Sequence, residues 1–459
     1  MLIRFKVKNF LSFDEEEEIS MISGKVRSKQ EHLYKKNKLS LLKFTAIFGA
    51  NAAGKSNLVT AMDLARHIIT REIPPNCINQ YFRINEKRKK ENSKFEFEIV
   101  LGGKYYAYGF ELVLNERSIR EEWLYELKPD NSEKLIFKRD TISKDIKFGQ
   151  EFRNKTLEIL KTYSRGMASD DSILFLTEMN RNKGDLYEKE RKLLPFREVY
   201  RWFERGFVVN YPDSELSPAY FLEKEKLDDI NILLPKLGLG ITQCKIVTAS
   251  QDELQQDIPM FPLNRIVEDF KKQTEALRKK GAKIQNSGAV IRGPNSFFIL
   301  KLDPDTQEIL IQKLQMEHEK VGTWFEINEE SDGTRRIFDL IELIISAKVG
   351  IRKVYVIDEI DRCLHPQLTY KLIKTYLDLV DQKEIQLIVT THESHLMDLN
   401  MLRRDEIWFV EKNTHGASHL YSLDQYNERF DKKIERAYLD GRYGGVPLFD
   451  KYFPLKEDE

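Results

Sequence analysis

The stretch GANAAGKS, residues 49–56, decides the fold class of this chain. It follows directly on a mostly apolar, β-compatible run at residues 41–48, and the apolar residues after it recur at helical spacing. The pattern GxxxxGK[ST] between a strand and a helix is typical of a loop that binds phosphate groups, because its glycines let backbone N–H groups point at the phosphates. We therefore expect an α/β fold whose strand-loop-helix unit binds a nucleoside triphosphate.

The side chains of this loop predict its chemistry. Lys55 places a positive charge near the β and γ phosphates, and Ser56 offers a hydroxyl ligand to Mg²⁺. Lys55 is therefore also a candidate catalytic residue. A tight turn without a ligand is the alternative, and the strand-loop-helix context argues against it. The residues predicted to bind the nucleotide are Gly49, Asn51, Gly54, Lys55, Ser56 and Asn57.

A second element, VYVIDE at residues 354–359, places two carboxylates after four strand-forming residues. At the carboxyl edge of a parallel sheet Asp358 would hold Mg²⁺, and Glu359 would polarise the attacking water. The pair of carboxylates favours hydrolysis over mere binding. The alternative is a solvated acidic loop, since Asp361 follows closely.

Two further motifs offer groups to a phosphate. Ser331 and Gly333 stand before an apolar-faced helix, where a helix N-terminus attracts anions, although SDG alone also fits an ordinary N-cap. His392 follows the strand-like run 386–389, which we expect to neighbour the Asp358 strand, so its imidazole could orient water or contact the γ-phosphate. The run HESH lacks the HExxH spacing of a metal pair, which disfavours metal binding there.

The rest of the chain divides into three predicted parts. Residues 1–150 contain the phosphate loop and alternating strands, including a hairpin with a Gly102-Gly103 turn. Residues 151–296 are charged and read as a mainly helical insertion. Residues 297–459 return to α/β character, with strands at 354–357, 386–389 and 407–410. The two outer parts are predicted to form one discontinuous nucleotide-binding domain.

The composition argues against a disordered protein, a membrane-spanning protein and a disulfide-rich protein. Of 459 residues 41% are hydrophobic, which can fill a core, and 74 basic residues balance 74 acidic ones. No apolar run approaches the length of a bilayer-spanning helix, and the N-terminus lacks the features of a signal peptide. The three cysteines show no CxxC pair. We expect a cytoplasmic protein with reduced thiols.

Taken in order, these motifs resemble the ABC-type ATPases of the SMC and RecF group. The likeness extends to LIRFKVKNFLSF at residues 2–13, to DEID with LHP after it, to TTHES at 390–394 and to YLDGRYGGVP at 438–447. These features look closest to the OLD-like, AAA15/AAA21-type ATPases of bacterial phage-defence systems, which include the ATPase subunits of AbiL, RloA/RloB and PARIS. The resemblance implies an ABC-type P-loop head with a mixed sheet, an antiparallel β subdomain and a helical insertion.

The resemblance also implies roles and partners. It assigns ATP and Mg²⁺ as cofactors, Ser331 and Gly333 to the γ-phosphate held by a second subunit, Asp361 to a loop at the dimer interface and His392 to γ-phosphate sensing. No glutamine could be named for the Q-loop, the Mg²⁺-binding loop that this family places between the phosphate loop and Asp358. The heads would pair as a homodimer or higher homo-oligomer. Too few residues follow His392 for a Toprim nuclease domain, so a toxic step would belong to a separate effector, such as a nuclease encoded nearby.

Three functional hypotheses follow. The first is an ATP-driven sensor that regulates an effector during phage infection, and the second is a RecF-like ATPase that binds DNA in repair or maintenance. A non-hydrolysing, ATP-gated scaffold is the third. DNA contact would involve the basic runs 87–90 and 278–283, although the composition of these runs favours solvated helix or loop surfaces.

Overall fold

The computed structural model of the chain describes most of its length. The described residues are 1–36, 39–128, 130, 132–213, 224–250, 252–253, 265, 268–272, 274–275, 288–292, 297–303, 306, 308–319, 322–426 and 434–443. The fold comprises two compact units. The first is formed by Met1–Pro212, Gly350–Asp361 and Leu372–Glu459, and the second by Asp213–Val349 and Arg362–Lys371.

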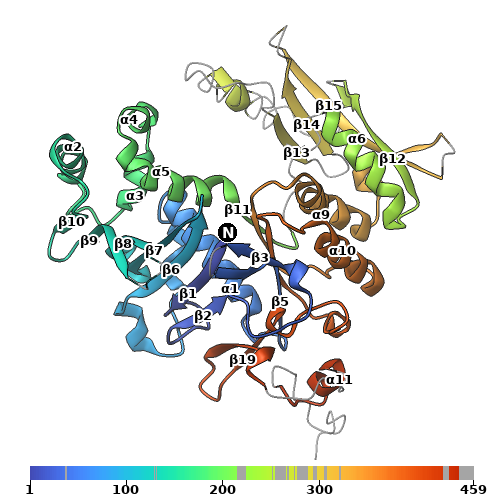
Figure 1. Cartoon of the computed structure of the whole chain (residues 1–459). Helices are drawn as coiled ribbons and strands as arrows, with labels where there is room; N and C mark the ends of the chain where they lie inside the picture. Colours follow the sequence, from blue (N-terminus) through green and yellow to red (C-terminus); the bar gives the residue numbers. More distant parts are fainter. Residues whose placement is uncertain are drawn as a thin grey trace, which may run out of the picture. The chain divides into compact units, whose positions relative to one another are not determined.

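An antiparallel sheet of seven strands forms one layer of the first unit (Figure 1). Its order is β10-β9-β8-β7-β6-β1-β2. The expected alternation is present in β1, where Phe5 and Val7 are fully buried and the lysines between and after them are half-buried. The expected hairpin is confirmed as β6 and β7, joined at Gly102-Gly103. The strand bounds are β1 Leu2–Lys8, β2 Glu17–Ser20, β6 Ser93–Leu101, β7 Lys104–Val113, β8 Ser118–Leu127, β9 Glu133–Asp140 and β10 Asp145–Phe148.

A mixed sheet of six strands forms the second layer of this unit, in the order β11-β17-β18-β5-β19-β20. The first five strands run parallel and β20 is antiparallel to β19. Every residue of β5, β17 and β18 is buried, as expected of strands covered on both faces. The bounds are β5 Phe44–Phe48, β11 Phe207–Asn210, β17 Val354–Ile357, β18 Gln386–Thr390, β19 Ile407–Lys412 and β20 Ser418–Ser422.

One continuous core joins the two layers through α1, Lys55–Thr70. The apolar face of α1, including Leu58 and Met62, shares this core with Phe97 of the antiparallel sheet and Val356 of the mixed sheet. Short helices also belong to the first unit, and α5 continues into a π-helical turn at Trp202–Gly206. The other helix bounds in this unit are α2 Asn154–Ser164, α3 Phe175–Asn180, α4 Gly184–Lys189, α5 Leu194–Arg201 and α11 Ile434–Leu439. Helix α10, Pro366–Leu379, begins in the second unit and ends in the first.

Two details differ from the sequence-based expectations. The apolar run 41–48 is shared between β4, Leu39–Leu42, and β5, because the chain breaks at buried Lys43, whose ammonium donates to the Glu31 carbonyl at 2.9 Å. The β4 strand pairs with β3, Leu33–Lys36. The range 151–296 also contains strands β11, β12 and β13 beside its helices. Strand β11 was not predicted because its four residues, FVVN, are too few to show a strand pattern.

The second unit has its own sheet, in the order β12-β15-β14-β13, with β16 paired to β15. Helices α6, Lys224–Leu233, and α9, Asp332–Val349, contribute Ile230, Phe338 and Ile341 to a core with residues of this sheet. The strand bounds are β12 Ile241–Thr248, β13 Gly288–Arg292, β14 Phe297–Leu302, β15 Ile309–His318 and β16 Trp324–Glu326.

The fold class is therefore confirmed as α/β, with a mixed sheet and an antiparallel sheet around the phosphate loop. Among the helices that the structure describes, none combines the length and hydropathy that a bilayer span requires. The predicted basic run 278–283 and residues 444–447 of the C-terminal motif lie outside the described residues.

Candidate nucleotide site

The phosphate loop connects β5 to the first turn of α1, so its backbone leads into a helix N-terminus. Gly54 has φ +116°, and a Cβ there would come within 2.7 Å of the Ser12 hydroxyl and against the Ser418 hydroxyl. The Ser418 hydroxyl donates to the Ala53 carbonyl at 2.6 Å, and Asn57 donates to Ser12 at 2.8 Å. Gly54 is thus required because the hydroxyls of Ser12 and Ser418 closely approach the position that a Cβ would occupy. These two serines, which lie outside the motif, support the loop.

Lys55 lies almost fully buried in this loop, with 5% of its surface exposed. Its ammonium donates to the carbonyls of Gly49 at 2.8 Å and Ala50 at 3.1 Å, and lies 3.5 Å from Nδ1 of His392. Burial lowers the pKa of Lys55 to about 8, against the opposing attraction of nearby carboxylates. A phosphate anion would favour the charged form of this amine.

Asp358 and Ser56 place oxygen atoms side by side at the end of β17 and the start of α1. The Ser56 hydroxyl lies 3.2 Å from Oδ1 of Asp358, and the Thr390 hydroxyl donates to the same oxygen. Asp358 is 4% exposed. Hydroxyl and carboxylate oxygens are the ligands that Mg²⁺ prefers beside nucleotide phosphates, so this pair fits the ion. The described residues contain no group of three or more His, Cys, Asp or Glu side chains arranged for a metal.

Glu359 has a backbone conformation that its residue type rarely adopts, with φ +45°. Its N–H donates to the Thr390 hydroxyl at 2.8 Å. Such conformations cost about 1–3 kcal/mol and concentrate at functional sites, where surrounding contacts maintain them. Thr390 therefore contacts both members of the carboxylate pair, on the Asp358 side chain and on the Glu359 backbone.

His392 follows β18, which pairs directly with β17 as the sequence predicted. Burial, and next the charge of Lys55, lower the pKa of His392, so its imidazole is neutral at pH 7. The His392 N–H lies 3.3 Å from a carboxylate oxygen of Asp361, to which it donates. Asp361 thus contacts the His392 backbone within its own unit.

These residues share one pocket of about 500 Å³ at the carboxyl edge of the mixed sheet. The pocket is lined by residues 51–57, Glu359, His392 and Lys412. Gly49 lies behind it and its carbonyl holds Lys55. Five of the six predicted nucleotide-binding positions of the loop therefore line this pocket, together with the predicted catalytic residues Glu359 and His392.

Ser331 and Gly333 belong to the second unit, at the N-terminus of α9. The Ser331 hydroxyl accepts from the Thr334 N–H at 3.2 Å, which is the geometry of an N-cap. A Cβ on Gly333 would come within 2.7 Å of the Cys363 carbonyl, so this position requires glycine for close packing. Ser331 is exposed, which leaves the helix N-terminus accessible.

Three residues at this edge were not predicted from the sequence. Thr390 and Lys412 end strands β18 and β19, and Asn210 ends β11, next to β17. The Asn210 carbonyl accepts from the Asp358 N–H at 2.9 Å. The resemblance implies a glutamine between the phosphate loop and Asp358, whereas an asparagine stands at the end of the strand beside Asp358. Because the carboxyl ends of parallel strands lie at one edge of a sheet, the last residues of β18 and β19 could have indicated Thr390 and Lys412, and Asn210 as well had β11 been recognised.

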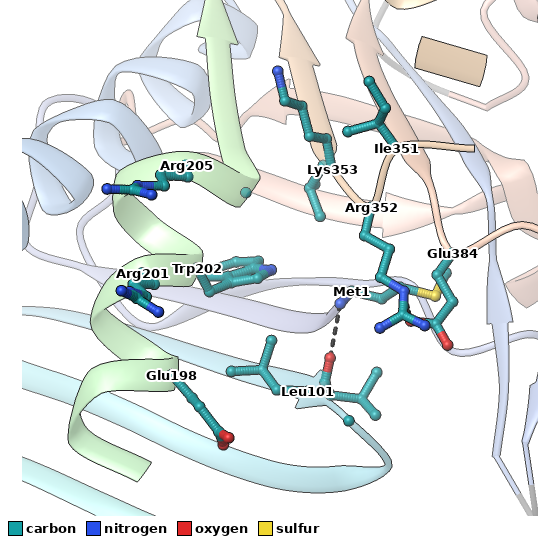
Figure 2. A pocket seen from close by; sticks show the side chains of 14 residues that line it. Met1, Leu101, Glu198, Arg201, Trp202, Arg205, Ile351, Arg352, Lys353 and Glu384 are labelled. Carbon is teal, nitrogen blue, oxygen red and sulfur yellow. Dashed lines mark hydrogen bonds and ion pairs between the residues drawn. The ribbon is translucent and has the colours of Figure 1, made fainter. Parts of the chain in front are cut away.

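A second pocket of the first unit, about 760 Å³, lies where β17 begins (Figure 2). Arg201 and Arg205 project from the helical turn on one side of this view, and Arg352 lies on the other side, 3.2 Å from Glu384. The basic side chains do not converge on one point, so they do not define an anion site.

Comparison with known proteins identifies the family of this chain. The family AAA_21, described as "AAA domain, putative AbiEii toxin, Type IV TA system", matches residues 44–398, and the chain belongs to this family. The chain is similar to a crystallised SMC head bound to the C-winged helix domain of ScpA, with 15% identity, a TM-score of 0.40, and coverage of 92% of this chain and 97% of that one. It is also similar to an SMC head domain from Thermotoga maritima, with 14% identity, a TM-score of 0.34, and coverage of 92% and 98%. The comparison with curated proteins gave no match.

Proposed function

We propose that this chain is a Mg²⁺-dependent ABC-type ATPase whose site is completed by a second copy, and that it regulates a separate effector in anti-phage defence. The observation that carries the ATPase proposal is the meeting of Lys55, Glu359 and His392 at one pocket. Asp358 lies 3.2 Å from the hydroxyl of Ser56, which lines the same pocket. Membership of the AAA_21 family supports it.

In this proposal each side chain has a distinct task. Lys55 and the loop N–H groups bind the triphosphate, while Ser56 and Asp358 would hold Mg²⁺, which supplies positive charge to the phosphate oxygens when bound. Glu359 orients the attacking water and accepts its proton. His392 is neutral, so it can accept or donate a hydrogen bond at the γ-phosphate without adding charge.

The pairing of two copies is proposed from the exposed N-terminus of α9. Ser331 is exposed there, and an 18-residue helix presents partial positive charge at this end. A γ-phosphate bound by a second copy would be attracted to it, with Gly333 allowing close approach. Asp361 would contribute at the same interface.

The defence role is supported by the toxin-antitoxin wording of the family description. We propose a cytoplasmic protein whose ATP-dependent pairing controls an effector, such as a nuclease encoded nearby. A plaque assay tests this role: cells carrying the gene with its neighbours should reduce phage plating, and Lys55→Ala should abolish the reduction. Equal plating with and without the genes, across a phage panel, would refute the role in defence against those phages.

Glu359→Gln tests the ATPase itself. It should lower kcat at least about a hundredfold, because the general base is lost, while ATP binding persists. Mass photometry with saturating ATP should then show a dimer. Glu158→Gln, an exposed change on α2, serves as the matched control. Wild-type turnover by Glu359→Gln would contradict hydrolysis at this site, and a monomer at saturating ATP would contradict the shared site.

A further inference from the structure

The C-terminal helix α11 contacts both loops that carry the nucleotide site. On one side Glu435 accepts a hydrogen bond from the Ser394 hydroxyl at 3.2 Å, and its carboxylate lies 2.7 Å from Nδ1 of His395. Ser394 and His395 belong to the short helical turn that follows His392. One side chain of α11 is thereby tied to the His392 loop.

On the other side Tyr438 reaches the phosphate loop. Its ring stacks on Phe409 of β19, with centroids 5.5 Å apart and planes at 18°. It also meets Phe48, the last residue of β5, edge to face at 6.4 Å. Since Phe48 immediately precedes Gly49, the ring packs where the strand becomes the phosphate loop.

The Tyr438 hydroxyl is hydrogen-bonded to the backbone of Gly49. Burial raises the pKa of this hydroxyl to about 12, and the bond to Gly49 acts in the opposite direction. The Gly49 carbonyl also accepts from the Lys55 ammonium at 2.8 Å.

The turn after α11 completes the attachment. Tyr443 is 1% exposed and stacks on Phe409 at 5.8 Å, and its carbonyl accepts from the Tyr421 hydroxyl. Gly441, with φ +77°, closes the helix by donating to the Tyr438 carbonyl. Phe409 therefore contacts two tyrosines of the C-terminal motif with nearly parallel rings.

We propose that α11 is part of the nucleotide site, with Tyr438 positioning the phosphate loop and Glu435 positioning the His392 loop. The proposal rests on the ATPase function proposed above. Neither residue touches the reacting atoms. Tyr438 fixes the Gly49 peptide from outside the loop, so the loop keeps its shape when Lys55 turns from the Gly49 carbonyl to a phosphate oxygen.

The test compares two tyrosine-to-phenylalanine variants of the full chain. Tyr438→Phe keeps the ring and removes the hydroxyl. Tyr187→Phe also removes one buried hydroxyl, which donates to the Met179 carbonyl at 2.8 Å and does not line the nucleotide pocket. Because one neutral hydrogen bond is lost in each, thermal unfolding should shift by similar amounts.

Only Tyr438→Phe should weaken ATP binding. Its Kd for a non-hydrolysable ATP analogue and its KM should rise about threefold to tenfold, with kcat changed less than twofold. Glu435→Gln should instead lower kcat more than it changes Kd, since it acts through the His392 loop. Hydrogen exchange at residues 48–53 should be faster in Tyr438→Phe than in Tyr187→Phe.

The outcomes separate this inference from the proposed function. If the wild type binds ATP and Tyr438→Phe binds it with equal affinity, the positioning role is overturned. If the wild type binds no ATP, the proposed function fails, while the exchange measurement still decides whether Tyr438 holds the loop. Equal exchange at residues 48–53 in both variants would overturn the structural contact.

Discussion

Thr390→Val should damage the site without changing the shape of the side chain. Thr390 is fully buried at the end of β18; its hydroxyl donates to Asp358 and accepts from the Glu359 N–H. Valine removes a bond to a charged group and leaves a partly buried N–H unpaired, which together cost about 2.5–6 kcal/mol. We expect the free energy of unfolding to decrease by an amount in this range.

Turnover should fall as well, because both carboxylate residues lose a contact that fixes their position. A shift of a catalytic group by about 1 Å can cost on the order of a hundredfold, so we expect kcat to fall about tenfold to a hundredfold. The assay is steady-state ATP hydrolysis at saturating Mg²⁺ and ATP, together with urea unfolding. Both measurements use the full chain.

Thr369→Val provides the matched control. Thr369 is also fully buried, but its hydroxyl has no hydrogen-bond partner among the described residues. Valine at this position removes a buried hydroxyl that makes no hydrogen bond to the described residues, so the free energy of unfolding should stay equal or rise. Wild-type turnover in Thr390→Val, or equal loss of stability in the two variants, would refute the assignment of Thr390.

Three other predictions concern the same pocket. Affinity for an ATP analogue should be constant below about pH 8 and should fall by up to about tenfold per pH unit above it, because Lys55 must be protonated to bind the phosphate. The measurement is Kd as a function of pH, and Lys55→Arg should show no such fall. Gly54→Ala should abolish ATP binding in calorimetry, because the new Cβ would clash with the Ser418 hydroxyl and because Gly54 has a positive φ. Gly184→Ala is the control and should bind ATP normally, since a Cβ at Gly184 would have open space around it. Lys412→Ala should raise the Kd for the ATP analogue several-fold at low salt and less at about 0.5 M salt, because Lys412 is an exposed charge at the rim of the pocket. An effect that does not depend on salt would contradict an electrostatic role for Lys412.

Local patterns were sufficient for the parts of the site that lie on continuous segments. The GANAAGKS loop, the VYVIDE strand and the TTH run each combine a buried strand with polar residues at its end, and the structure has all three strands parallel and adjacent. The prediction for His392 needed only the assumption that its strand neighbours the Asp358 strand. That assumption is confirmed.

Residues that act through distant contacts were not predictable in this way. Ser12 and Ser418 support Gly54 from positions 42 residues before it and 364 residues after it (54 − 12 and 418 − 54), and nothing local marks either serine. Tyr438 belonged to a motif noticed only as a family resemblance, and its contact with Gly49 arises from packing against Phe409.

The sequence by itself determined the chemistry of the phosphate loop, because a strand, a glycine loop and a helix need only neighbouring residues to form. It also determined the order of the carboxylates and the histidine along the chain. Only the tertiary structure decided that Thr390 joins Asp358 to Glu359, that Asn210 ends the strand beside them, and that α11 contacts both loops. Those contacts depend on the order of strands in the mixed sheet, which is set by the burial of whole faces and not by any single segment.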